Sequence, residues 1–582
     1  MEEKKVLLSV KDLHVKFKVR GRILTAIRGI SLDFYEDESI AIVGESGSGK
    51  SVFTKTFAGM LDSNGYVDQG SIIFNDDALA DTHVDLNDTA RQMIDYNRKK
   101  LGEYSRLELG ADVYRQMKAL EAEKKEKMTL SEEEDQKLTG KIDELTFQRT
   151  ELFNQKQTID ARKEKARYNE TAAQIDELDK QIKQLKKERE EIISAHAKAA
   201  KADAEYNKHY EERMAALKEQ YASLTAGEIT EETKARNEIL AKEIYLSIGR
   251  YGIRRRWKMN RQLVKALKTA MTIGVDLDSE DERNKVFDTV AFRVRYLDET
   301  PEKLHGTCVI NLAKVRYSKD WTQIRGRRIA TVFQDPMTSL NPIITIGKQI
   351  SSVIMKHQGC TEAEARERAL ILMKKVGIPN AENRYDDYPF QYSGGMRQRI
   401  VIAIALSCQP KILICDEPTT ALDVTIQAQI LKLIKDLQKE FGYTIVFITH
   451  DLGVVANVAD RVAVLYAGQI VELGTVEEVF YDPRHPYTWA MLSSLPQLAQ
   501  RNTKLYSITG TPPSLYNKIV GDPFAPRNPY CLKIDTLKDA PMFKVTDTHY
   551  AKTWLLDPRA PKIEKPEAIR NLHDKLVEAF NI

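Results

Sequence analysis

The 582-residue sequence predicts an α/β fold, a mainly parallel sheet covered by helices, with a long helical insertion. Residues 6–76 and 323–475 alternate β-branched apolar runs with stretches of helical periodicity, as is typical of such a sheet. Residues 81–320 differ, because they carry 47 basic and 46 acidic residues and one of the 19 prolines. A charge-rich, proline-poor block inside an otherwise average chain indicates an insertion.

The composition excludes several classes of protein. Lys and Arg total 88 and Asp and Glu total 85, a net charge of +3, which argues against a polycationic nucleic-acid coat or an acidic tail protein. No apolar run approaches the roughly 18 residues of a membrane span, and the charged N-terminus lacks a signal-peptide core. The five cysteines form no CxxC pair, which argues against a disulfide scaffold or a cysteine-rich zinc site. A soluble, cytosolic protein is expected.

Apolar residues spaced three and four apart predict long helices in the middle of the insertion. They form three seams: Leu138, Ile142, Leu145, Leu152 and Ile159; Ile175, Leu178, Ile182, Leu185 and Ile192; and Tyr210, Met214, Leu217, Tyr221 and Leu224. Such seams on charged helices predict coiled-coil packing. Because each seam is short, a folded-back hairpin or small bundle is expected. A basic stretch from Arg250 to Lys268 could meet anionic lipid or nucleic acid, but the balancing acidic residues favour a solvated helix face.

A phosphate-binding loop is predicted at residues 44–51. Its residues are Gly44, Glu45, Ser46, Gly47, Ser48, Gly49, Lys50 and Ser51, which match G-x-x-x-x-G-K-S/T at every fixed position. The motif follows the apolar strand 39–43 and precedes a helix-compatible stretch. Its glycines let backbone N–H groups face phosphate oxygens, Lys50 would reach the β- and γ-phosphates, and the Ser51 hydroxyl would ligate Mg²⁺. The alternative is a glycine- and serine-rich turn without a ligand.

Two adjacent carboxylates form a second chemical element. Asp416 and Glu417 end the apolar run 412–415. Asp416 would hold Mg²⁺, and Glu417 could polarise an attacking water. A strand that ends in two carboxylates is a weak signal alone, but together with the loop at 44–51 it is a strong one.

Between these elements, residues 392–398 resemble the signature sequence of ABC transporter ATPases. The helix start at Ser393, Gly394, Gly395 and Met396 would offer backbone N–H groups to a γ-phosphate presented by another subunit. Met396 stands where the general signature has Gln, although one subfamily commonly carries Met. The resemblance implies a P-loop NTPase fold of the ABC nucleotide-binding type, with a RecA-like core, an antiparallel β subdomain and a helical signature subdomain. It also implies that two such domains enclose two ATP molecules.

The same resemblance assigns roles to further residues. Gln334 is the Q-loop residue, which senses Mg²⁺ and contacts the membrane subunit, and Asp423 belongs to the D-loop. His450 is the switch histidine that contacts the γ-phosphate. Phe17 lies where the family stacks an aromatic ring on adenine, although an aromatic residue on a strand is usually a core residue.

Longer motifs narrow the resemblance. Residues 333–342, 391–399 and 482–488 resemble the oligopeptide/dipeptide-permease ATPases of the OppD type, and 549–555 resembles the OppD/AmiE proteins of Gram-positive bacteria. The expected organisation is therefore a first part of the nucleotide-binding domain at 1–78, the helical, coiled-coil-like insertion at 79–322, the remainder of that domain at 323–485, and a C-terminal oligopeptide-permease-type region at 486–582.

The C-terminal region departs from many relatives, which place four cysteines there, consistent with an iron–sulfur cluster. In this chain Asp522, Asn528, Asp535 and Thr553 occupy the matching positions, and Cys531 falls off the pattern. One thiol cannot hold such a cluster, so no iron–sulfur cluster is expected.

The resemblance implies an ATP- and Mg²⁺-dependent ATPase that powers oligopeptide import from the cytoplasmic face of the cell membrane. The implied partners are a second, OppF-type ATPase, two integral membrane permeases and, indirectly, an extracellular peptide-binding lipoprotein; no nucleic acid is expected. The alternative is an SMC-like ABC ATPase that acts on DNA through its coiled coil. In SMC proteins the coil separates the Q-loop from the signature, whereas here Ser393 follows Gln334 by 59 residues and the insertion lies upstream.

Overall fold

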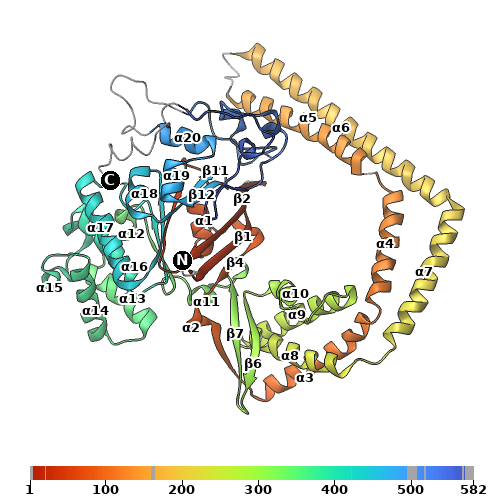
Figure 1. Ribbon diagram of the computed structural model, residues 1–582, viewed down its shortest axis with the longest axis horizontal. Coiled ribbons are helices and arrows are strands. Elements are labelled where there is room, and N and C mark those ends of the chain that lie inside the picture. Colours follow the sequence, from red (N-terminus) through yellow and green to blue (C-terminus); the bar gives the residue numbers. More distant parts are fainter. Residues whose placement is uncertain are drawn as a thin grey trace. The chain divides into compact units, whose positions relative to one another are not determined.

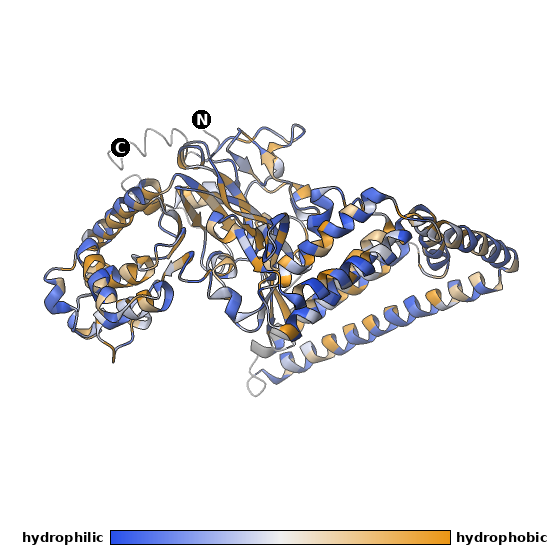
Figure 2. Cartoon of the chain, turned by 90° about the horizontal axis from the view of Figure 1, so that it is seen from below, coloured by the Kyte–Doolittle hydropathy of each residue, from blue (hydrophilic) through white to orange (hydrophobic). Residues whose placement is uncertain are grey.

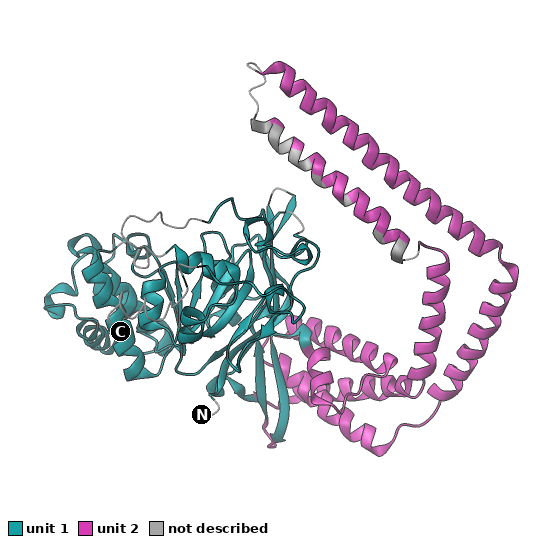
Figure 3. Cartoon of the chain, turned by 45° about the horizontal axis from the view of Figure 1, so that its top comes forward, with its two compact units in different colours: residues 1–83, 288–298, 305–582 teal, residues 84–287, 299–304 magenta. Residues whose placement is uncertain are grey.

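The computed structural model describes residues 4–19, 21–130, 132–158, 164–420, 422–494, 508–516, 519–566 and 569. The chain divides into two compact units, coloured teal and magenta in Figure 3. The first comprises residues 1–83, 288–298 and 305–582, and the second comprises 84–287 and 299–304. Residues 79–83, 288–298 and 305–322 were expected in the insertion, but they fall in the first unit.

A sheet with a parallel centre organises the first unit (Figure 1). Its strand order is β13-β14-β12-β11-β3-β10-β9-β8, in which β8, β9, β10, β3 and β11 run parallel and β12 to β14 extend one edge antiparallel. The bounds are β3 Ser39–Val43, β8 Ile329–Val332, β9 Ile412–Asp416, β10 Thr444–Thr449, β11 Arg461–Tyr466, β12 Gln469–Thr475, β13 Phe543–Lys544 and β14 Tyr550–Ala551. Strands β3 and β10 are buried along their whole length, as central parallel strands covered on both faces are.

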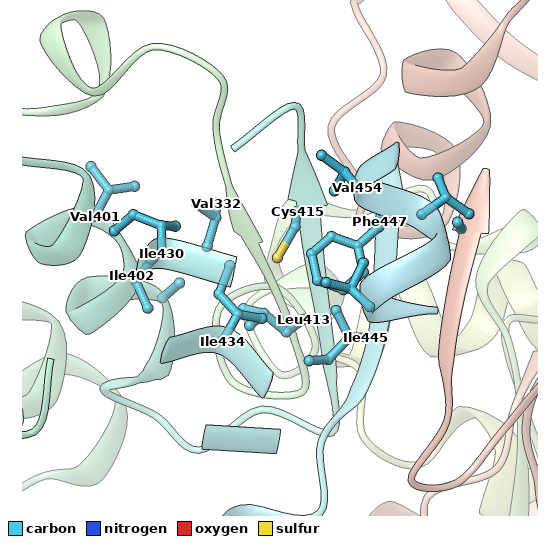
Figure 4. Packing of buried hydrophobic residues seen from close by; sticks show 14 of the residues in the cluster. Val332, Val401, Ile402, Leu413, Cys415, Ile430, Ile434, Ile445, Phe447 and Val454 are labelled. Carbon is cyan, nitrogen blue, oxygen red and sulfur yellow. The ribbon is translucent and has the colours of Figure 1, made fainter. Parts of the chain in front are cut away.

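Helices cover this sheet and complete its core. Figure 4 shows Leu413, Cys415, Ile445 and Phe447 of the strands packed with apolar side chains of helices α16 (Gly394–Leu406) and α17 (Val424–Phe441). The other helices of the first unit are α1 Lys50–Phe57, α2 Asp77–Ala80, α11 Ser318–Trp321, α12 Pro336–Ser339, α13 Ile346–Gln358, α14 Glu362–Lys375, α15 Ala381–Arg384, α18 Leu452–Val458, α19 Val476–Tyr481 and α20 Pro486–Ser493.

A second, largely antiparallel sheet also contributes to the first unit. Its order is β2-β1-β4-β7-β5, with β6 paired to β7, and its bounds are β1 Val6–Val19, β2 Arg22–Tyr35, β4 Gly65–Phe74, β5 Asp81–Asp85, β6 Phe292–Glu299 and β7 Lys303–Asn311. Residues 292–311 were expected in the helical insertion. They form strands instead, because Ile310 and Asn311 of β7 pair with Phe74 and Ile73 of β4 and bury Ile310.

The second unit is helical, as the periodicity predicts. Its helices are α3 Asp88–Glu108, α4 Ala111–Lys127, α5 Glu132–Thr158, α6 Lys165–Ala202, α7 Ala204–Thr225, α8 Glu231–Ile248, α9 Ile253–Ile273 and α10 Glu280–Val286. The chain folds back on itself, because α5 packs on α6, α4 on α7, and α3 on α8. Ile159 of the first predicted seam lies outside the described residues. Coiled-coil geometry along the seams stays a prediction.

The third seam has a clear packing role within this unit. Met214 and Leu217 of α7 pack with Val113 and Leu120 of α4. Elsewhere on these helices hydrophilic residues dominate and apolar residues recur at intervals, which gives the alternating blue and orange of the long helices in Figure 2. Among the described helices of the whole chain, none is long and apolar enough to cross a membrane.

In the C-terminal region, four side chains stand where many relatives have cysteines, and each of them forms a hydrogen bond within a local turn. The Asp522, Asn528 and Asp535 carboxylate or amide oxygens accept the backbone N–H groups of Phe524, Tyr530 and Leu532, respectively. The Thr553 hydroxyl accepts that of Leu555. These short polar side chains therefore satisfy backbone donors that would otherwise lack a partner. The absence of a cluster stays a prediction.

Removing the α5–α6 hairpin should leave the rest of the second unit folded. The cut ends lie close together, since the Lys127 ammonium sits 3.6 Å from the centre of the Tyr206 ring. Replacing residues 130–202 by a short Gly/Ser turn should therefore lower the helical circular dichroism signal but keep one cooperative thermal transition. By contrast, Leu217→Asp buries a charge in the α4–α7 contact and should destabilise by about 3 kcal/mol. Loss of the transition in the deletion variant would contradict the expectation.

The buried Asp522 should make folding stability depend on pH. Burial raises its pKa to about 6, and Asp535 and Asp539 act in the same direction. The unfolded chain releases this proton near pH 4, whereas the folded chain holds it up to about pH 6, so stability should fall as pH rises between these values. Asp522→Asn keeps an oxygen for the Phe524 N–H but cannot ionise. It should be more stable than the wild type by about 2–3 kcal/mol at pH 7 and about equal to it near pH 4.

Thermal unfolding from pH 4 to pH 7 measures this difference, with the exposed Asp62→Asn as the matched control. A stability difference that stays constant over this range would show that Asp522 does not titrate as described.

Candidate active site

The loop at residues 44–51 has the backbone geometry that its glycines predict. Gly44 has φ +153°, and a Cβ there would lie 2.1 Å from the Leu465 carbonyl oxygen, so no other residue fits. Gly49 has φ +105° and begins helix α1 without a side-chain cap. The N–H groups of the first turn of α1 are therefore free of a side-chain acceptor and can meet an anion.

Two polar side chains of the loop, those of Lys50 and Ser48, are suited to binding an anion. The Lys50 ammonium donates to the carbonyl oxygens of Gly44 (2.7 Å) and Glu45 (3.0 Å), which places it inside the loop. Burial lowers the pKa of Lys50, while the carboxylates of Glu417, Asp416 and Glu45 act in the opposite direction. The buried Ser48 hydroxyl has no hydrogen-bond partner within the part of the chain that the structure describes. Glycine amides, an ammonium and a spare hydroxyl together fit a polyphosphate.

A magnesium site can form beside this loop. The Ser51 hydroxyl donates to Asp416 Oδ1 at 3.2 Å. Burial raises the pKa of Asp416, against the effects of the Ser51 hydrogen bond and Lys55. The Asp416 carboxylate and the Ser51 hydroxyl are hard oxygen ligands of the kind that Mg²⁺ prefers. Gln334, whose Nε2 binds Glu417, carries an amide oxygen of the same kind.

Glu417 binds two of the candidate residues, Gln334 and His450, and also Thr420. Its carboxylate accepts hydrogen bonds from Gln334 Nε2 (2.8 Å) and the Thr420 hydroxyl (3.2 Å), and it lies 3.2 Å from His450 Nδ1. Its backbone has φ +45°, a strained value for a non-glycine residue and one that is common at functional sites. No role for Thr420 was predicted from the sequence. Its position three residues after Glu417 was the only signal in the sequence that could have suggested this contact.

The C-terminal region holds the loop through Glu45. The Arg527 guanidinium donates to both Glu45 oxygens, at 2.7 and 3.0 Å, and also to the Tyr466 hydroxyl at 3.1 Å. The Tyr487 hydroxyl accepts the Glu45 backbone N–H at 2.8 Å. Sequence reasoning assigned no role to Arg527 or Tyr487, since each lies more than 400 residues from the loop.

The predicted signature residues lie at a different helix start. Ser393 caps α16, and its hydroxyl accepts the Met396 N–H at 3.4 Å. Gly395 packs so closely on α17 that a Cβ would lie 2.7 Å from Ile426, whose N–H is accepted by Asp423 at 3.0 Å. Ala421, two residues before the D-loop residue Asp423, lies outside the described residues. Within the described ranges, no hydrogen bond or ion pair joins Ser393–Met396 or Asp423 to the loop at 44–51.

Phe17 lies on β1 and is 9% exposed. Its ring occupies the space beside Gly65 of β4, where a Cβ would lie 2.6 Å from the ring. This is a core position in the sheet. Its predicted contact with adenine stays a prediction.

Two protein-family models match this chain. The ABC transporter family model matches residues 27–250 and 294–420. The model for the oligopeptide/dipeptide transporter C-terminal region matches residues 471–534, which include Arg527 and Tyr487.

Three relatives carry peptide-transport names. The oligopeptide transport ATP-binding protein AmiE of Streptococcus pneumoniae is 67% identical over 268 residues, covering 46% of this chain and 76% of that protein. OppD of Bacillus subtilis is 59% identical, covering 45% and 74%. The dipeptide transport ATP-binding protein DppD of Lactococcus lactis is 58% identical, covering 43% and 72%. These matches do not support the alternative of an SMC-like protein acting on DNA. The chain belongs to the ABC transporter ATP-binding family and, within it, to the OppD/AmiE-type oligopeptide transport ATP-binding proteins.

Proposed function

We propose that this chain hydrolyses ATP to power oligopeptide import, with Glu417 as the residue that activates water. The observation that carries the proposal is the convergence of Glu417, Gln334 and His450 beside the phosphate loop. The names of the relatives supply the substrate class, since they are oligopeptide and dipeptide transport ATP-binding proteins.

The phosphate loop is assigned to grip the triphosphate. Its backbone N–H groups and the start of α1 would bind phosphate oxygens, and Lys50 would exchange its carbonyl partners for the β- and γ-phosphates. Ser51, Gln334 and Asp416 would hold Mg²⁺. When bound, this ion neutralises charge on the phosphates.

Glu417 is placed to orient the attacking water as a general base. Gln334 and Thr420 donate to its Oε2, so one oxygen is fixed and the other lies toward His450. In the assigned role His450 would leave Glu417 and contact the γ-phosphate. Lys50 and His450 then stabilise negative charge on the transferred γ-phosphoryl group as its bond to the leaving ADP breaks.

A second ATPase subunit would complete the site. Ser393, Gly394, Gly395 and Met396 begin α16 with backbone N–H groups suited to the γ-phosphate held by the partner. Asp423 caps the start of the neighbouring helix α17. Because α16 and α17 pack closely there, a partner that closes on the start of α16 would also contact the start of α17. We assign an OppF-type subunit to this place, which forms a heterodimer.

The permease contact is assigned to an apolar cavity of about 370 Å³ that includes Phe333, next to Gln334. Its lining also includes Met60, Val353, Val401 and Ile404. A helix end of a permease would fit there, and a shift of the Gln334 loop on ATP binding would reach it directly. This arrangement implies a peripheral protein at the cytoplasmic face of the membrane, with two permeases and an extracellular lipoprotein that select the peptide.

Glu417→Gln should separate ATP binding from hydrolysis. The amide keeps the shape of the side chain but cannot accept a proton, so kcat should fall at least 100-fold while the Kd for ATP changes less than threefold. Glu367→Gln, at an exposed position on α14, is the matched control and should behave like the wild type. The measurements are phosphate release by the assembled transporter and nucleotide binding to the isolated chain. Retained turnover would remove Glu417 from this role.

Arg527→Met should weaken nucleotide binding although Arg527 is not assigned to touch the nucleotide. Loss of the bidentate pair frees the Glu45 side chain, so the Kd for ATP should rise about 5- to 20-fold, or about 1–2 kcal/mol. A double-mutant cycle with Glu45→Gln should return a coupling energy of similar size. Arg559→Met, which removes an exposed guanidinium from its pair with Asp557, is the control. If Arg527→Met lowered the Tm but left the Kd unchanged, the pair would be structural only.

A further inference from the structure

Four side chains of metal-binding types, two aspartates and two histidines, meet on three strands of the antiparallel sheet. Asp81 and His83 lie on β5, Asp298 on β6 and His305 on β7. All four belong to the first unit, although the second unit separates them in the sequence. Asp81 and His83 are two residues apart on a strand and so point to the same face. The mechanism proposed above uses none of them.

The two histidines lie close to the same oxygen atom of Asp81. His305 Nε2 lies 2.9 Å from Asp81 Oδ1, and His83 Nδ1 lies 3.6 Å from the same oxygen. One ligand atom from each of Asp81, His83 and His305 falls within 4.8 Å of the others. These separations are close to those between ligand atoms around a single metal ion, where each ligand lies about 2 Å from the metal.

Asp298 adds a carboxylate on the far side of the His305 ring. Its Oδ2 lies 3.1 Å from His305 Nδ1, on the opposite side of the ring from Asp81. A metal-ligating histidine almost always donates its second ring N–H to a carboxylate, carbonyl or water, which sets the tautomer and directs the other nitrogen at the ion. Asp298 can hold His305 in this way.

A simple histidine–aspartate hydrogen bond is the competing explanation. The same sheet contains one, His14 Nε2 to Asp12 Oδ1 at 3.1 Å. That pair has one imidazole and one carboxylate. The cluster on β5, β6 and β7 has two of each, and its second imidazole, His83, lies face to face with His305 at 4.4 Å. A hydrogen-bonded pair does not require that second imidazole.

We propose that Asp81, His83 and His305 bind one divalent transition-metal ion of the Zn²⁺ class, with Asp298 as a positioning residue for His305. Two imidazoles and one carboxylate suit Zn²⁺, and water would complete a tetrahedral set. Binding requires the half-exposed His83 ring to turn out of the stack so that one nitrogen faces the ion. Because β5 precedes the helical unit and β6 and β7 follow it, the ion would fasten together the strands by which the chain leaves and re-enters this sheet.

The test uses the full-length chain, stripped with a chelator and titrated with ZnCl₂ by calorimetry and by competition with a chromophoric chelator. One equivalent should bind with a micromolar or lower Kd, MgCl₂ should not compete, and Co²⁺ should give the absorption of a tetrahedral site. His83→Ala and His305→Gln should each weaken binding at least tenfold. Asp298→Asn should weaken it 10- to 100-fold.

His14→Ala is the matched control and should leave Zn²⁺ affinity unchanged. Unaltered ATP binding and circular dichroism in each variant show that the chain is folded, because the phosphate loop does not include these residues. The proposal is overturned if the wild type binds no stoichiometric Zn²⁺, or if His83→Ala and His305→Gln bind as the wild type does. Either result would leave the cluster as hydrogen-bonded surface side chains, and the proposed ATPase function would stand.

Discussion

The register of the central parallel strands is the constraint on which the site depends. Val43 of β3 lies opposite Thr449 of β10, and Ile448 of β10 lies opposite Asp416 of β9. The residues that follow these strand ends, Gly44, Glu417 and His450, therefore emerge at one edge of the sheet. Parallel strands place their carboxyl ends together, and a slip of one residue would reverse which face each side chain occupies.

The phosphate loop is held from two directions. On one side, the Gly44 backbone lies so close to the Leu465 carbonyl oxygen that no Cβ fits between them. On the other side, Arg527 and Tyr487 of the C-terminal region bind the side chain and backbone N–H of Glu45. The oligopeptide-type C-terminal region thus makes direct contact with the loop at residues 44–51. A charged pair this poorly exposed keeps its strength better than one in open solvent, and its bidentate geometry allows few alternatives.

The helical unit leaves the parallel sheet uninterrupted. It enters after β5 and returns before β6, both in the antiparallel sheet. It therefore lies upstream of β9, which ends at Asp416, and of β8 and β10, which are followed by Gln334 and His450. The unit builds its own apolar contacts, such as Met214 and Leu217 against Leu120. An insertion with its own core is well tolerated by the host domain, because its two ends join strands that belong to the same sheet.

The sequence by itself determined the features that depend on neighbouring residues. The glycine loop at 44–51, the strand ending in Asp416 and Glu417, and the long helices of the insertion follow from local backbone preference and periodicity. Tertiary structure alone decided that 292–311 are strands paired into the first unit, that Arg527 binds Glu45 across 482 positions, and that His83 meets His305. The physical reason is that such contacts depend on sheet order and register. Many distant segments have the apolar pattern of a strand, and pattern alone does not select the partner.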